Sequence, residues 1–489
     1  MHSNTTTPLA RRSNGAPRRP LGFGILLFGI YLGFGILGFG ISARSASVTL
    51  TIDTSHPAQP ILGFGASGCW WAQEVGAWPK TQRREIMRLL FDKQTGLGLT
   101  IYRHNLGADS YADTTMRAKP NRHTESMLDT TTGRFDWSRD ANARRVMREA
   151  VDAGASEIIL FVNSPPVNMT INKHSYGPAK DATNLAPARY ADFAAYLADI
   201  TAHFLNVEKL PVTVVSPLNE PEWDWATKRH QEGNHNTPAQ TAATLRAVYD
   251  EFKRRALPVR VEGPEGGSYE STIPYFEAIN ADPVLRAGMK DFAVHSYWSN
   301  NAQREKFLAW LDKNRPDARV HMTEWCEMKS GDAPGMDSAL VMANTIIDDF
   351  TKARATTWQY WTAVHEPVWH AGLLYFDNDA RKYTLTKRYW VYGQFTRYLE
   401  KNSVVLPLKS SDKRAPAMAA RLPDGRVAVI AANLSNENKN LSIKFPANKT
   451  ETWRQQQRVI TDAANNNAET PASDVLPAQS VVTIIFQKS

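Results

Sequence analysis

The chain has 489 residues and a formal net charge of +8 at pH 7, with 42% hydrophobic and 22% charged residues. This composition is typical of a packed globular protein and excludes a mainly disordered chain. Two cysteines are too few for a disulfide scaffold or a multi-ligand zinc module. Five arginines and no acidic residue lie in residues 1–46, so the rest of the chain carries only +3. The basic excess therefore belongs to the N-terminus and does not indicate a nucleic-acid partner.

The first 46 residues have the pattern of a targeting segment. Residues 21–41 are uncharged and mostly apolar, arginines precede them, and the stretch SARSAS follows. A helix of this length would measure about 31 Å, enough to cross a bilayer, so a cleaved signal peptide and a membrane anchor both remain open. The Ala/Ser-rich exit favours cleavage. We expect a secreted or periplasmic protein that contacts a membrane only if residues 21–41 are retained.

After residue 46, short apolar runs alternate with segments of helical spacing. Eight runs are expected to be buried strands, at residues 61–67, 99–107, 157–166, 211–221, 259–266, 291–298, 318–325 and 355–363. Eight strand–helix alternations over about 300 residues favour a (β/α)8 TIM barrel in the α/β class. A doubly wound open sheet is the alternative, because periodicity does not separate the two.

The pattern changes near residue 400 to short strands with turns such as Pro423-Asp424-Gly425, which is typical of a β-sandwich. The alternating run 47–53 has no partner in the barrel, so we expect it to pair with the C-terminal sheet. The predicted domains are a targeting segment at 1–46, a strand segment at 47–60, a catalytic barrel at 61–400 and a β-sandwich at 401–489.

In such barrels, the residues just past the strand C-termini face the active site. Those positions hold Arg103, Asn163, Asn219, Glu220, Glu262, Glu265, His295, Tyr297, Glu324 and Trp361. Two carboxyl groups stand out, Glu220 in NEPEWDW and Glu324 in TEW, because each ends an apolar run where ionisation is costly. Glycoside cleavage requires such a pair, one acid to protonate the leaving oxygen and one carboxylate to attack or to activate water.

The motifs GFGAS (63–67), NSPPVNMT (163–170), NEPEWDW (219–225), HSYW (295–298) and TEW (323–325), in this order, resemble those of glycoside hydrolase family 30. The resemblance extends from about residue 47 to the C-terminus. It implies a retaining mechanism with Glu220 as general acid/base and Glu324 as nucleophile.

The resemblance also implies roles for residues around this pair. Asn219 would hydrogen-bond the sugar 2-hydroxyl, and Arg103 would lie beside the nucleophile. Tyr297 and His295 would hold the nucleophile or the sugar, and Trp361 would form the floor of the subsite. Further expected substrate contacts are Asn163, Trp223, Trp225 and Glu265.

Within the family, the motifs are most similar to the endo-β-1,6-galactanase branch. One departure is Val167-Asn168-Met169, where the family often has Trp–Met, and it puts the identity of the sugar in doubt. The alternatives are a β-1,6-glucanase, a glucosylceramidase-like enzyme, a xylan-directed hydrolase and a non-catalytic carbohydrate-binding protein. We expect a polysaccharide or glycoconjugate substrate, no cofactor, no metal and a monomeric protein.

Other motifs fit their known functions poorly. GFGASG (63–68) matches the dinucleotide fingerprint, but no helix is expected to start directly after it. The histidines of HEPVWH (365–370) are five residues apart, which places them on different helix faces, and Pro367 opposes a helix. Cys69 and Cys326 both follow barrel strands, and the sequence leaves open whether they are bonded.

Overall fold

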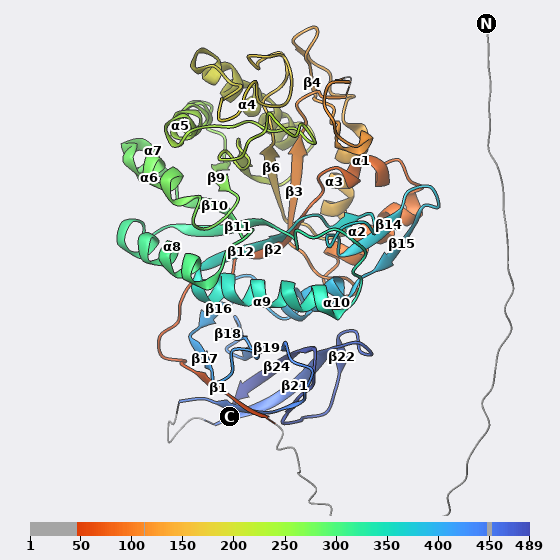
Figure 1. Ribbon diagram of the computed structural model, residues 1–489, viewed down its shortest axis with the longest axis vertical. Coiled ribbons are helices and arrows are strands. Elements are labelled where there is room, and N and C mark those ends of the chain that lie inside the picture. Colours follow the sequence, from red (N-terminus) through yellow and green to blue (C-terminus); the bar gives the residue numbers. More distant parts are fainter. Residues whose placement is uncertain (1–45, 112, 447–451) are drawn as a thin grey trace, which may run out of the picture. The chain divides into compact units, whose positions relative to one another are not determined.

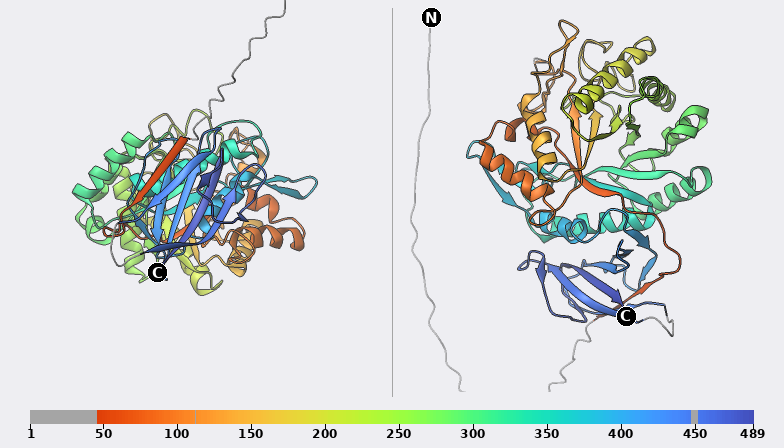
Figure 2. Two further views of the ribbon diagram at one scale, coloured as in Figure 1. Left: turned by 90° about the horizontal axis from the view of Figure 1, so that it is seen from below. Right: turned by 180° about the vertical axis from the view of Figure 1, so that it is seen from behind.

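The computed structural model describes residues 46–111, 113–446 and 452–489 (Figures 1 and 2). The expected targeting segment at 1–46, with its apolar run 21–41, lies outside them except for Ala46, which begins a strand. In these ranges, no helix is both long and apolar enough to span a bilayer. The described residues fall in a single compact unit.

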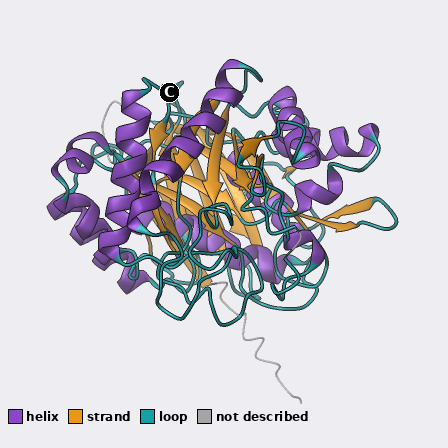
Figure 3. Ribbon diagram, turned by 90° about the horizontal axis from the view of Figure 1, so that it is seen from above, coloured by secondary structure: helices purple, strands orange, loops and turns teal. Residues whose placement is uncertain are grey.

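Parallel strands form a barrel at the centre of this unit (Figure 3). In spatial order they are β8 (Arg260–Val261), β7 (Val212–Ser216), β6 (Glu157–Val162), β3 (Ile101–Leu106), β2 (Gly63–Ser67), β12 (Ala355–Tyr360), β11 (Arg319–Trp325), β10 (Asp291–His295) and β9 (Gly263–Gly266). The two outer members, β8 and β9, are consecutive in the chain and flank Glu262. The sheet therefore returns to itself, which confirms the (β/α)8 barrel and excludes an open doubly wound sheet.

Helices follow each strand position and surround the barrel. They are α1 (Trp71–Val75), α2 (Lys80–Phe91), α3 (Ala141–Ala153), α4 (Tyr190–Asn206), α5 (Pro238–Arg254), α6 (Ile273–Ala281), α7 (Pro283–Gly288), α8 (Asn301–Asn314), α9 (Met336–Lys352) and α10 (Lys387–Thr396). Short elements in the connections are β4 (Leu128–Asp129), β5 (Arg134–Phe135), β13 (Val364–His365), β14 (Leu374–Asp377), β15 (Lys382–Leu385) and the 3-10 turns Pro120–Arg122 and Pro187–Arg189.

Helix α5 shows why these segments are helical. Thr237 caps its N-terminus by accepting a hydrogen bond from the Gln240 backbone N–H, and the Gln240 side chain accepts one from the Thr237 N–H. This reciprocal pair satisfies two N–H groups that would otherwise lack partners. Leu245, Val248 and Phe252 are buried at helical spacing, so one face of the helix packs on the barrel.

Five of the eight expected strands extend too far at their C-terminal ends, whereas the runs 61–67, 259–266 and 318–325 end where the strands end. The run 211–221 was expected to be one strand, but β7 ends at Ser216 and residues 217–221 are buried without strand structure. The loops at this end fold into the barrel mouth, so their apolar residues are buried like those of a strand. Buried apolar residues therefore continue past the last hydrogen bond of the strand, so the apolar pattern of the sequence does not show where the strand ends.

The C-terminal strands form two sheets that pack as a β-sandwich. The six-stranded sheet contains β16 (Val404–Leu406), β18 (Ala417–Arg421), β19 (Val427–Asn433), β24 (Ser480–Lys488), β21 (Trp453–Thr461) and β22 (Ala468–Glu469). The four-stranded sheet contains β17 (Leu408–Ser410), β1 (Ala46–Ile52), β20 (Lys439–Lys444) and β23 (Val475–Leu476). The N-terminal strand β1 pairs with β17 and β20, beside the blue strands in Figure 2, as expected from its sequence.

The sandwich is joined to the barrel through α10. The side-chain amide of Gln394 donates to Thr461 Oγ1 (2.9 Å) and accepts from Thr483 Oγ1 (2.6 Å), and all three groups are buried. Helices α9 and α10 lie between the barrel strands and the sandwich (Figure 1). Because these contacts are buried and hydrogen-bonded, the sandwich supports one side of the barrel.

Candidate active site

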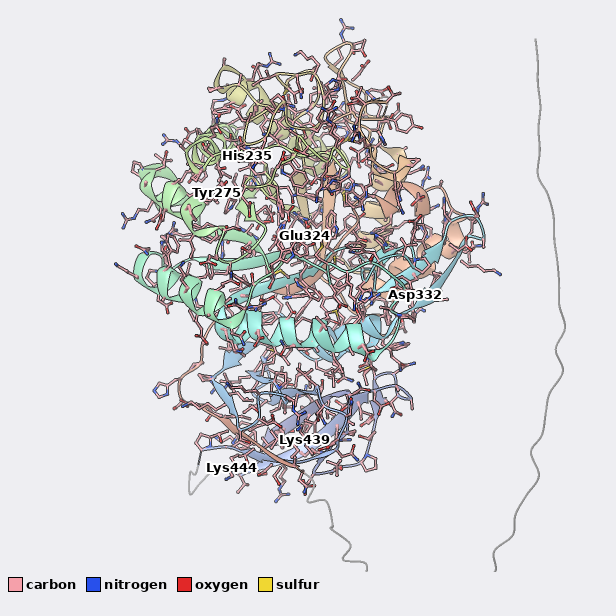
Figure 4. All side chains as sticks on the ribbon, in the orientation of Figure 1. His235, Tyr275, Glu324, Asp332, Lys439 and Lys444 are labelled. Atoms are coloured by element: carbon pink, nitrogen blue, oxygen red, sulfur yellow. The ribbon has the colours of Figure 1, made fainter. Side chains whose placement is uncertain are left out.

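Two carboxyl groups converge at the C-terminal ends of the barrel strands. Glu220 lies in the loop after β7, and Glu324 lies near the end of β11, at the centre of the barrel in Figure 4. One oxygen of each and one ring nitrogen of His295 all lie within 4.8 Å of one another. The residues that the sequence placed 104 positions apart are therefore neighbours in space.

The backbone at Glu220 is held in an uncommon conformation. Its φ is +41°, in the left-handed region that favours glycine, and its N–H donates to the Glu265 carbonyl at 2.8 Å. Trp225 is buried, and its indole N–H donates to the Glu220 carbonyl at 2.9 Å. These bonds fix the direction of the Glu220 side chain. Trp225, expected to line a subsite, thus lies behind the loop and positions Glu220.

Both oxygens of Glu324 accept hydrogen bonds. Arg103 Nη1 donates to Oε2 at 2.7 Å, and the Tyr297 hydroxyl donates to Oε1 at 3.1 Å. Arg103 is completely buried, and its guanidinium carbon lies 3.6 Å from the centre of the Phe161 ring. Since the cation and the hydroxyl hold both oxygens, the carboxyl group has a fixed orientation towards the barrel mouth.

Glu220 has a different environment. Burial raises its pKa to about 7, and the nearby charge and hydrogen bond of His295 only partly oppose this effect. Its Oε1 lies 3.2 Å from His295 Nδ1. Near neutral pH, a large fraction of Glu220 therefore carries a proton, which is the form that a general acid requires.

A third carboxyl group, Glu265, lies beneath this pair and is not exposed. Burial alone would raise its pKa, but the Arg103 cation and the hydrogen bond from His295 lower it to about 2. Its oxygens accept from Ser216 (2.7 Å), His295 (3.1 Å) and Thr323. With its oxygens occupied, Glu265 orients His295 rather than facing the open cleft, where a substrate contact was expected.

His295 links the carboxyl groups. Burial opposes its charge, but Glu324 and the bonds to Glu220 and Glu265 raise its pKa to about 10. Two cations, Arg103 and His295, therefore face three carboxyl groups. One of the three can keep its proton while the charges stay balanced, and Glu220 suits this role because Arg103 contacts the other two, Glu265 and Glu324.

The remaining expected residues border this centre. Asn219 accepts from Arg103 Nη2 at 3.4 Å through its carbonyl oxygen, which leaves its amide NH2 available. Asn163 donates to Asn105 at 3.0 Å, and its own carbonyl oxygen is buried without a hydrogen-bond partner. Trp361 is half-buried and packs edge-on against Trp70, with ring centres 5.1 Å apart. Trp223, three residues after Glu220, is exposed.

The two cysteines are unbonded and buried in the structure. Cys69 lies near the Asn163 amide, and Cys326 lies 4.0 Å from the Tyr297 hydroxyl. They flank the site as free thiols, which answers the question that the sequence left open.

Several residues at this site were not expected from the sequence. Trp298 follows Tyr297 directly in HSYW and was given no role at the site, whereas 57% of it is exposed. Glu222 and Gly267, beside Glu220, were not singled out either. Trp298 could have been found from its place after a strand, but the contact between Glu222 and Gly267 joins two loops and leaves no local signal.

Residues 47–284 match the model of O-glycosyl hydrolase family 30. These residues therefore carry the pattern of a glycoside hydrolase family 30 domain. One relative among curated proteins is an endo-β-1,6-galactanase of Hypocrea rufa. The two are 28% identical over 387 residues, which cover 74% of this chain and 76% of the relative.

Solved structures share the fold of this chain. A conserved exported protein from Bacteroides fragilis is 22% identical and has a TM-score of 0.79, with 89% of this chain and 100% of that chain covered. The catalytic domain of family 30 xylanase C from Talaromyces cellulolyticus is 18% identical and has a TM-score of 0.72, with 90% and 100% covered. At these identities, the likeness establishes the fold of barrel plus β-domain.

Proposed function

We propose that this family 30 glycoside hydrolase is a retaining enzyme that cleaves β-1,6-linked galactan within the chain. The observation that carries the proposal is the approach of the Glu220 and Glu324 carboxyl oxygens to within 4.8 Å. Retaining glycosidases hold their carboxyl groups about 5–5.5 Å apart, whereas inverting enzymes need about 6.5–9.5 Å to admit a water molecule.

In the first step, Glu324 attacks the anomeric carbon and forms an ester bond to the sugar while the glycosidic bond breaks. Glu220 gives its proton to the departing oxygen. In the second step, Glu220 takes a proton from water, whose oxygen attacks the same carbon and displaces Glu324. The available amide of Asn219 would donate to the sugar 2-hydroxyl, a contact that strengthens as the ring flattens.

Two lines of support point to galactan. The Hypocrea rufa relative is named an endo-β-1,6-galactanase and matches across three quarters of both chains. The NSPP and NEPEWDW motifs are also most similar to that branch. We further propose export, directed by residues 21–41, in keeping with the description of the Bacteroides fragilis neighbour as an exported protein.

A substrate panel tests the sugar and the linkage. We expect the purified protein to release oligosaccharides from β-1,6-galactan and to leave β-1,6-glucan, glucuronoxylan and glucosylceramide largely intact. Chromatography of early products should show several chain lengths at once, because internal bonds are cut. Release of single sugars alone, or faster cleavage of another substrate, would overturn the assignment.

The pH dependence should report on Glu220. Because its pKa is about 7 and the protonated form is required, kcat/KM for a galacto-oligosaccharide should fall as the pH rises through 7. The His295 cation favours the ionised form of Glu220, so His295→Asn should move this fall to higher pH. Initial rates across a pH series give the pH of this fall in the wild type and in His295→Asn. A fall that stays in place or moves to lower pH in His295→Asn would contradict the assignment.

A further inference from the structure

Two tryptophans differ from all the others in this chain. All 14 lie within the described residues, and only Trp223 and Trp298 are exposed, by 38% and 57%. Their ring centres are 5.2 Å apart and the rings meet edge-on. Trp223 follows Glu220 by three positions and Trp298 follows His295 by three. The exposed indoles therefore form one pair beside the proposed acid.

The backbone holds Trp298 in this exposed position. Its φ is +50°, which is rare for a bulky residue, and such strain is concentrated at functional sites. Its ring also contacts Tyr297, with centres 5.4 Å apart, and the Tyr297 hydroxyl donates to Glu324. The Trp298 ring thus contacts both Trp223 and Tyr297, and the Tyr297 hydroxyl orients Glu324.

A glycine keeps open the space between the acid and this pair. A Cβ atom at Gly267 would lie 3.2 Å from Trp223 Nε1 and 3.3 Å from Glu220 Oε1. Glu222 fixes the glycine loop, because its Oε1 accepts from the Gly267 N–H and the Ser271 hydroxyl, both at 2.6 Å. Any side chain at position 267 would crowd the Glu220 carboxyl group.

A second aromatic group lies on the opposite half of the barrel mouth. Trp70 follows β2 and Trp361 follows β12, and these two strands are neighbours in the sheet. Trp361 lies 5.9 Å from the Arg103 guanidinium carbon. The mouth therefore has one aromatic group near Arg103 and another, formed by Trp223 and Trp298, near Glu220.

We propose that Trp298 determines specificity on the leaving-group side, where it forms with Trp223 a stacking platform for a hexopyranosyl residue. The inference rests on the proposed role of Glu220 as the acid. In the first step the platform binds the departing sugar. When a sugar replaces water in the second step, the platform binds this acceptor. The bond from C1 to Glu324 breaks, a C1–O bond to the acceptor forms, and the acceptor's proton passes to Glu220.

The test compares two substrates with the same sugars on the other side of the cleavage point. β-1,6-Galactotetraose has a sugar leaving group, whereas β-1,6-galactobiosyl fluoride releases only fluoride. Trp298→Ala should lower kcat/KM roughly tenfold more for the tetrasaccharide than for the fluoride, because only the former loses a stacking contact. With the fluoride as donor and β-1,6-galactobiose as acceptor, the ratio of transfer to hydrolysis should fall by a similar factor.

Tyr111→Ala is the matched control, since Tyr111 is 74% exposed on the loop after β3, and it should change neither ratio. Trp298→Phe keeps a stacking ring and should recover part of the lost kcat/KM. It also replaces Trp298→Ala in the test if the alanine variant has a lowered melting temperature. Equal losses on both substrates, or an unchanged transfer ratio, would overturn the platform. A wild-type protein inactive on both substrates would instead overturn the proposed function, and the platform with it.

Discussion

The Glu324→Gln variant should lose turnover of β-1,6-galactan by about four orders of magnitude or more, because an amide cannot form the glycosyl ester. Its fold should be kept. The glutamine is nearly isosteric, its carbonyl oxygen can accept from Arg103, and its NH2 can donate to the Tyr297 hydroxyl. Initial rates and a thermal melt measure the two expectations.

Glu327→Gln is the control for Glu324, because Glu327 lies three positions further along the chain and bonds His370 instead. It should keep turnover near the wild-type rate. A Glu324→Ala variant supplied with azide should form α-galactosyl azide, since azide then replaces the missing nucleophile in a single displacement. Wild-type rates in Glu324→Gln would show that another group attacks the sugar.

The loss of kcat/KM on removing the Glu220 acid should depend on the leaving group of the substrate. Glu220→Gln should lower kcat/KM for galacto-oligosaccharides by about 10²–10⁴-fold, the usual contribution of a general acid. A dinitrophenyl galactobioside should lose much less in its first step, because that leaving group departs without a proton. The fall in rate above pH 7 should also disappear, since it is assigned to the Glu220 proton.

Glu277→Gln, at an exposed carboxyl on α6, is the control for this variant and should behave as the wild type on both substrates. Azide added to Glu220→Ala should give β-galactosyl azide, the opposite anomer to that from Glu324→Ala. Equal losses on the dinitrophenyl and oligosaccharide substrates would mean that Glu220 does not donate the proton.

Much of the fold followed from the sequence because barrel strands are short, apolar and regularly spaced. The eight expected runs each contain a barrel strand, and the run 47–53 pairs with the C-terminal sheet. Strand ends were less predictable, as in the run 211–221. There the loop that carries Glu220 is buried in the barrel mouth, so burial no longer marks strand structure.

The site also has residues that the sequence could predict and residues that it could not. Glu220 and Glu324 could be selected because a carboxyl group after an apolar strand has an energetic cost that needs a reason. The pairing of His295 with Glu265 depends on the contact between two neighbouring strands, and the place of Trp225 depends on how the loop after β7 turns back on Glu220. Trp298 was not selected because exposed and buried tryptophans have the same composition signal, and its place after a strand was the one available clue.

The anomeric configuration of the first product tests the central claim most directly. Two successive displacements at the anomeric carbon restore its original configuration. Proton NMR of β-1,6-galactan during the first minutes of hydrolysis, before mutarotation, should show the β anomer at the new reducing end. The α anomer as first product would mean direct attack by water and would contradict a covalent intermediate on Glu324.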